Sequence, residues 1–95
     1  MIRIAGAHHF FSYLDEKAFF EWAESIPCVV ETTHGDLHIA SDDLEESDLR
    51  DLLAIMTRYQ LQMKELQQFL NPENEEWFRS ADAYWYESVF GEELE

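Results

Sequence analysis

Residues 28–41 read CVVETTHGDLHIAS, and this pattern predicts a β-hairpin. β-Branched side chains stand on both sides of the Gly35-Asp36 pair, which favours a two-residue turn between antiparallel strands. With that turn, Thr33 faces His38 across the hairpin. Because alternate residues of a strand point to opposite faces, one face of the hairpin carries the apolar residues that can pack on helices. These residues are Val30, Leu37 and Ile39.

A short strand and one helix are predicted before the hairpin. Residues 2–4 alternate apolar and polar side chains, which is the pattern of a half-buried strand. Asp15 is the expected N-cap of a helix over residues 16–25, and Leu14 and Phe19 have the spacing of a hydrophobic staple. The helix face that is predicted to be buried consists of Phe19, Trp22, Ala23 and Ile26.

Apolar residues spaced three and four apart predict a long helix over residues 48–70. Its apolar seam consists of Leu49, Leu52, Met56, Tyr59, Met63, Leu66 and Leu70. A continuous helix of this length would span about 33 Å at 1.5 Å per residue, which is long for a domain of this size. The pattern therefore leaves two alternatives open, one continuous helix or a helix that breaks near Gln60.

Two shorter helices are predicted after the long one. Asn71-Pro72 combines a capping residue with proline at the first helical position, which predicts a helix over residues 73–78. Ser80 is the expected cap of a last helix that ends at Phe90, and Gly91 is its C-terminal stop.

The order of these elements predicts a small single domain of the α+β class. Its short, mostly antiparallel three-stranded sheet is expected to consist of the N-terminal strand and the 28–41 hairpin, packed against three to four helices. Residues 1–91 are expected to form this domain, and residues 92–95 are expected to be a disordered acidic tail.

The charge of the chain narrows the classes of partner that it can bind. The 95 residues include 21 Asp plus Glu and 6 Lys plus Arg, which gives a net charge of −15 at pH 7. A surface of this sign repels nucleic-acid phosphates and anionic lipid headgroups, so neither nucleic-acid binding nor membrane binding is expected. A basic protein is the favoured partner, although general solubility also explains an acidic surface.

No familiar catalytic, cofactor or metal motif is present in the sequence. It lacks H-E-x-x-H, the G-x-S-x-G nucleophile elbow and a phosphate-binding glycine loop. His34 and His38 belong to opposite faces of the predicted hairpin, and the adjacent His8 and His9 point apart in an extended chain. We therefore expect no enzyme activity, no cofactor and no metal. The enzyme alternative is a dispersed site around His8, His9 and His38.

The location of the chain follows from what its sequence lacks. No apolar run is long enough to span a bilayer, and the N-terminus has no basic segment followed by an apolar one, as a signal peptide would. A cytoplasmic location is therefore expected. Cys28 is the only cysteine, so an internal disulfide is excluded.

Two acidic patches are the candidate binding surfaces. Consecutive aromatic residues on a helix cannot all face one core, so at least one aromatic side chain in the C-terminal patch is expected to be exposed. Aromatic burial would supply affinity for a basic partner and carboxylates would supply orientation. The C-terminal patch consists of Glu73, Glu75, Glu76, Asp82, Tyr84, Trp85, Tyr86 and Glu87, with Trp85 or Tyr86 as the anchor. The second patch consists of Asp42, Asp43, Glu45 and Glu46.

These patches favour an acidic binding protein, of the inhibitor, immunity-protein or adaptor kind, that docks on a basic protein surface. Immunity proteins against cationic toxins and protein mimics of DNA use the same physics. The alternative from another class is a small structural homodimer that pairs through the long helix over residues 48–70.

Overall fold

The computed structural model describes residues 2–7, 9–33 and 35–91 of the chain. Three strands, β1 (Ile2–Ile4), β2 (Val29–Thr33) and β3 (Asp36–Ile39), form an antiparallel sheet in the order β1-β3-β2. The helices are α1 (Tyr13–Ser25), α2 (Glu46–Arg58), the 3-10 helix η1 (Lys64–Phe69), α3 (Glu75–Phe78) and α4 (Tyr86–Phe90). This arrangement confirms the predicted α+β class.

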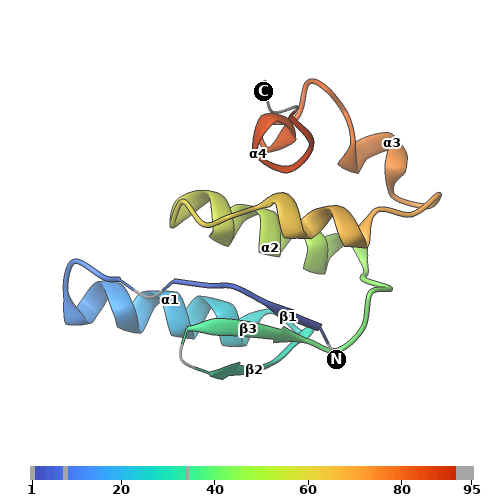
Figure 1. The fold of residues 1–95 in the computed structure, drawn as a ribbon. Coiled ribbons are helices and arrows are strands. Elements are labelled where there is room, and N and C mark those ends of the chain that lie inside the picture. Colours follow the sequence, from blue (N-terminus) through green and yellow to red (C-terminus); the bar gives the residue numbers. More distant parts are fainter. Residues whose placement is uncertain (1, 8, 34, 92–95) are drawn as a thin grey trace.

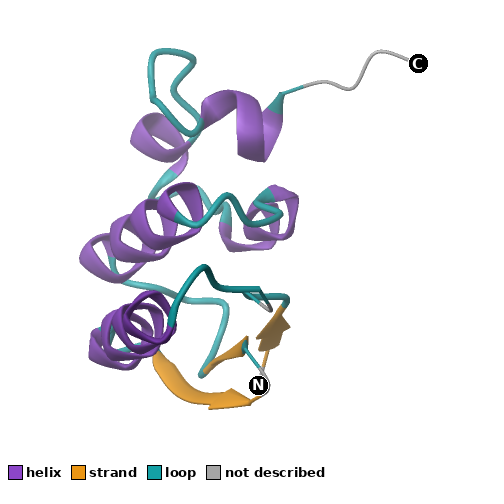
Figure 2. Ribbon diagram, turned by 90° about the vertical axis from the view of Figure 1, so that its left-hand side faces the viewer, coloured by secondary structure: helices purple, strands orange, loops and turns teal. Residues whose placement is uncertain are grey.

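The elements lie in successive layers (Figures 1 and 2). The sheet and α1 form one end of the molecule, α2 and η1 lie in the middle, and α3 and α4 form the other end. Helix α1 contacts β2 and α2, whereas α4 contacts η1. Apolar side chains from nearly every element meet in one core, including Ile4, Phe19, Leu37, Leu52 and Phe78.

The hairpin forms as predicted, but its register differs from the prediction by two residues. Thr33 pairs with Asp36 and not with His38, so Asp36 belongs to β3 and not to the turn. Gly35 supplies a positive φ of 88° in this turn, a conformation that glycine adopts without steric cost. Asp36 is drawn into β3 because its carboxylate accepts a hydrogen bond from the backbone N–H of Gly6 and lies 3.6 Å from Arg3 Nε.

A bulge in β2 changes which valine faces the core. The pairing of β2 with β3 shifts between Val29 and Glu31, so Val30 is an extra residue on its strand. Val29 is therefore buried and Val30 is 52% exposed, which reverses the prediction for Val30. Leu37 and Ile39 are buried as predicted.

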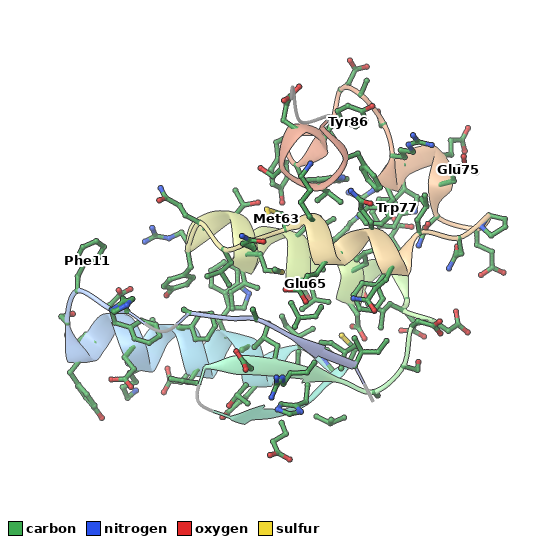
Figure 3. All side chains as sticks on the ribbon, viewed as in Figure 1. Phe11, Met63, Glu65, Glu75, Trp77 and Tyr86 are labelled. Carbon is green, nitrogen blue, oxygen red and sulfur yellow. The ribbon has the colours of Figure 1, made fainter. Side chains whose placement is uncertain are left out.

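Helix α1 begins three residues earlier than predicted. Its N-cap is Ser12, whose hydroxyl accepts a hydrogen bond from Asp15 N, while the Asp15 carboxylate accepts one from Phe11 N. This reciprocal pair resembles a capping box. Leu14 is exposed and forms no staple with Phe19, and Phe11 projects into solvent (Figure 3). The predicted inner face is confirmed: Phe19, Ala23 and Ile26 are buried, and Trp22 is partly buried.

The long helical pattern breaks at Gln60, so the second of the two sequence alternatives is correct. Helix α2 ends at Arg58, Gln60 has a φ of 57°, and η1 runs back in the opposite direction (Figure 1). The apolar seam nevertheless stays in the core on both sides of the break. Leu49, Leu52, Met56, Met63 and Leu66 are buried, and Tyr59 and Leu70 pack against the core.

The C-terminal helices are shorter than predicted. Helix α3 begins at Glu75, because residues 71–74 form a turn that the predicted cap, Asn71, organises. Ser80 accepts a hydrogen bond from Asp82 N and caps a turn, whereas α4 begins only at Tyr86. Gly91 ends α4 as predicted. The predicted tail, residues 92–95, lies outside the described residues.

No helix in the described parts of the chain is both long enough and apolar enough to cross a membrane.

Candidate functional site

The two acidic patches meet at one groove. A cavity of about 580 Å³ lies between the segment before α2 and the segment that leads into α3. It is lined by Asp43, Leu44, Glu45, Glu46, Asn71, Glu73, Asn74 and Trp77, which we call the acidic groove. A second cavity of about 500 Å³ shares three of these residues, Asp43, Asn71 and Glu73, so the hollow extends past the groove toward Leu70 and Pro72.

The first wall of the acidic groove is the segment that begins α2. Leu44 packs against the core and fixes this segment, while Asp43, Glu45 and Glu46 are exposed around it. Glu45 occupies the N-cap position of α2 without a capping hydrogen bond from its side chain. Carboxylates at a helix N-terminus are favoured by the helix dipole, so this wall can hold a dense negative charge at little cost to stability.

The second wall is the turn at residues 71–74, which side-chain hydrogen bonds hold rigid. Asn71 Oδ1 accepts from the backbone N–H groups of Glu73 and Asn74, both at 2.9 Å. Asn74 Oδ1 accepts in return from Asn71 N at 2.9 Å, and Asn74 Nδ2 donates to the carbonyl of Phe69 at 2.8 Å. Asn74 is buried and fully engaged, so this wall presents Glu73 to the groove on a fixed backbone.

Trp77 adds an aromatic surface to the groove and already holds one cation. The Arg50 guanidinium lies over the Trp77 ring, 4.3 Å from its centroid, and 5.8 Å from the centroid of Trp85. Arg50 Nε also donates to a carboxylate oxygen of Glu46 at 2.7 Å. Glu46 and Trp77 are both lining residues of the groove, so Arg50 sits at its rim.

Helix α3 turns its two faces to different surroundings. Figure 3 shows Trp77 on the inner side of α3 and Glu75 on its outer side. The remaining acids of the predicted C-terminal patch, Glu76, Asp82 and Glu87, are exposed but do not line the acidic groove. The predicted patch is therefore divided: Glu73 lines the groove, and the other acids lie outside its lining.

The exposed aromatic residue of this region is Tyr84. It is 62% exposed, whereas its neighbour Trp85 is 5% exposed and donates a hydrogen bond from its indole N–H to the carbonyl of Phe78 at 2.7 Å. Trp85 is therefore a core residue, and its burial corrects the prediction that it anchors a partner. Tyr86 is partly buried, with its ring 6.0 Å from that of Phe90.

The sequence analysis did not single out Arg50, and it named Trp85 and not Trp77 as a possible anchor. The spacing of Glu46 and Arg50, four residues apart on one helix, is a visible signal for an ion pair. Nothing in the sequence indicates that Trp77 lies under this guanidinium, since α2 and α3 are joined by a segment with a break and a 3-10 helix.

The histidines give no support for a shared site in the described residues. His9 lines a surface pocket with Tyr59 and Gln60 that does not include His38. His38 lies on β3 beside Arg3 and Glu31 of the flanking strands, and its Nε2 atom is buried without a hydrogen-bond partner. His8 and His34 lie outside the described residues. No group of three or more His, Cys, Asp or Glu in the described ranges could hold a metal ion.

The buried seam also bears on self-association. A homodimer that pairs through residues 48–70 needs the seam at its surface, but Leu49, Leu52, Met56, Met63 and Leu66 all lie in the core. These side chains are not accessible to a second chain unless the core opens.

Burial raises the pKa of both Cys28 and Asp48. Burial, with a smaller contribution from the carboxylates of Asp48 and Asp51, raises the pKa of the Cys28 thiol from 9.0 to about 12. The thiolate is the reactive form of cysteine, so Cys28 is an inert core residue at neutral pH. Burial also raises the pKa of Asp48 above its ordinary value of 3.8, and the nearby charges of Glu45 and Asp51 act in the same direction.

Asp48→Asn is expected to stabilise the fold at pH 7 and to lose this advantage as the pH falls toward 4. Because the folded chain holds the Asp48 proton to a higher pH than the unfolded chain does, ionisation of Asp48 destabilises the fold as pH rises through that interval. Urea unfolding measured between about pH 4.5 and pH 7 checks this expectation, because the range begins just above the ordinary pKa of a carboxyl group. Asp82→Asn, an exposed site with the same charge change that does not contribute to the Asp48 pKa, is the control. A stability loss in Asp48→Asn that is the same at every pH would contradict the expectation.

No protein-family model, curated protein or solved structure matches the chain. The functional argument therefore rests on the acidic groove itself.

Proposed function

We propose that this chain is a non-catalytic acidic binding protein, of the inhibitor, immunity-protein or adaptor kind, whose acidic groove docks on a basic surface of another protein in the cytoplasm. The observation that carries the proposal is the convergence of two acidic segments, around Asp43–Glu46 and Glu73, on one hollow with an aromatic wall. The two walls come from segments that lie about thirty residues apart in the sequence, so the fold itself concentrates the charge.

Electrostatics supports this choice of partner. A chain with a net charge of −15 produces a negative potential that attracts cationic surfaces and accelerates their association. A groove lined with one sign of charge focuses that potential at its mouth. The apolar surfaces of Leu44 and Trp77 inside the groove allow a docked side chain to be desolvated as well as attracted.

The test is affinity capture from a lysate of the source cells with three forms of the full chain. One is wild type, and one is the groove variant Asp43→Asn, Glu45→Gln and Glu73→Gln. The control removes the same charge elsewhere, through Glu16→Gln, Asp82→Asn and Glu87→Gln. We expect wild type and the control to retain basic proteins at low salt, and the groove variant to retain fewer of them. Moderate salt is expected to release these proteins.

Equal capture by the groove variant and the control would contradict docking at the acidic groove. Retention that does not weaken as salt rises would contradict an electrostatic mode of binding. Circular dichroism of each form checks that the fold is intact, which is expected because every substituted side chain is exposed.

A further inference from the structure

Arg50 makes, within one chain, the contact that a basic partner would have to make with the groove. Its guanidinium lies over Trp77 at 4.3 Å from the ring centroid and its Nε is 2.7 Å from a Glu46 oxygen. Both contacted side chains line the acidic groove. Arg50 therefore shows one geometry in which a guanidinium fits against these two lining side chains, with a ring on one side of the cation and a carboxylate at its edge.

We propose that Glu46 and Trp77 form a binding site for an arginine side chain of the partner protein, and that Arg50 occupies this site in the unbound chain. The inference rests on the proposed function and adds to it the chemistry of the residue that is recognised. It makes Arg50 an internal competitor, which leaves the site when a partner arginine enters the groove.

The geometry selects arginine over lysine. A guanidinium is planar, so it can stack on an indole ring and donate to a carboxylate in its own plane at the same time. A lysine ammonium is a compact and strongly hydrated charge that gains less from the ring face. Other carboxylates of the groove, such as Glu45 and Glu73, attract both cations and do not discriminate between them.

Arg50 can leave the site at small cost. The side chains of Arg50 and Glu46 are 46% and 56% exposed, and an exposed ion pair of this kind contributes little to stability. Helix α2, which carries both residues, is held by its buried side chains, including Leu49, Leu52 and Met56. The helix therefore stays in place when the Arg50 side chain moves away. The exchange replaces one guanidinium with another and leaves no carboxylate unpaired.

The test uses the full chain and two synthetic peptides, one of alternating glycine and arginine and the same peptide with lysine in place of arginine. Affinities are measured by calorimetry at low ionic strength, and the indole N–H signals are followed by NMR. Wild type is expected to bind the arginine peptide more tightly, by about two- to fivefold, the contribution of an exposed cation–π contact. The indole signal of Trp77 is expected to move.

Arg50→Lys is the decisive variant, because it keeps the net charge and removes the planar competitor. We expect the arginine peptide to bind this variant about two- to fivefold more tightly than it binds wild type. Arg79→Lys is the matched control, since the Arg79 guanidinium lies over Phe90 at 5.8 Å from its centroid and away from the groove lining. Trp77→Leu is expected to abolish the preference for arginine while keeping the lysine affinity.

Three outcomes would overturn the inference. Equal affinity for the two peptides, with both weakened in the groove variant, would remove the arginine site and leave the proposed function standing. If neither peptide binds while basic proteins are still captured through the groove, the arginine site is likewise removed and the proposed function stands. Unchanged or weaker arginine binding in Arg50→Lys would show that Arg50 does not compete. The Arg50 result holds even if Trp77→Leu fails to fold.

Discussion

Gly6→Ala is expected to destabilise the fold by about 3 kcal/mol or more, because the new methyl group meets backbone and not a movable side chain. A Cβ atom at Gly6 would lie 1.7 Å from the carbonyl oxygen of Gly35 and 2.9 Å from its carbonyl carbon. Relief requires the segment after β1 to move away from the hairpin turn. That movement also stretches the hydrogen bond from Gly6 N to the Asp36 carboxylate, which is 3.2 Å long.

Urea unfolding followed by tryptophan fluorescence measures this effect. Ala5→Ser is the control, since Ala5 is the exposed neighbour of Gly6 and surface substitutions change stability by about 0.5 kcal/mol or less. A Gly6→Ala variant as stable as Ala5→Ser would show that the segment after β1 does not lie against the turn.

Trp85→Ala is expected to cost about 3–5 kcal/mol, the usual range for removing a large buried aromatic side chain. Trp85 contacts the rings of Trp77 and Tyr84, with centroids 6.1 and 4.9 Å away. Its loss also leaves the buried carbonyl of Phe78 without the indole N–H that it now accepts from at 2.7 Å. In a small domain with a total stability of about 5–15 kcal/mol, this loss unfolds a measurable fraction of the chains.

The adjacent residue supplies the control. Tyr84→Ala removes an aromatic ring of similar size from a site that is 62% exposed, and we expect a loss of about 1 kcal/mol or less. Trp85→Phe keeps most of the buried surface and removes the indole N–H, so its stability should lie between those of Trp85→Ala and wild type. Equal losses for Trp85→Ala and Tyr84→Ala would contradict the burial of Trp85.

Local patterns predicted the order of most elements, whereas the bounds of the helices and the way the elements join depend on contacts between distant residues. The hairpin, the apolar face of α1 and the seam over residues 48–70 all follow from spacing alone. The hairpin register does not, because pairing Thr33 with Asp36 and pairing Thr33 with His38 both leave Gly35 in the turn. The choice between the two registers depends on the contacts of Asp36 with Gly6 and Arg3, which lie about thirty residues away in the sequence.

The break at Gln60 was uncertain for a related reason. Apolar spacing reports which residues face a core, and residues on both sides of the break face the same core. The pattern therefore continues through a point where the backbone does not. Gln60 carries no glycine or proline signal, so its positive φ could not be predicted from its identity.

The acidic groove was predicted in its parts and not as a whole. Its acids were singled out, but as two patches, because their proximity depends on how α2, η1 and the 71–74 turn pack together. Asn71-Pro72 predicted a helix over residues 73–78, whereas the structure has a turn at residues 71–74 before a helix that begins at Glu75. The role of Trp77 and the position of Arg50 over it are products of tertiary structure, with only the spacing of Glu46 and Arg50 visible in advance.

The sheet order β1-β3-β2 has a consequence for how the molecule closes. Strands β2 and β3 meet through a tight turn, whereas β1 pairs with β3 across α1 and the whole hairpin. Loop-closure entropy grows with the logarithm of loop length, so joining β1 to β3 costs about 2 kcal/mol more than closing the hairpin. The hairpin contacts, which are short in sequence, thus stabilise one edge of the sheet. The other edge strand, β1, depends on Ile2, Ile4 and the close approach of Gly6 to close the longer of the two loops within the sheet.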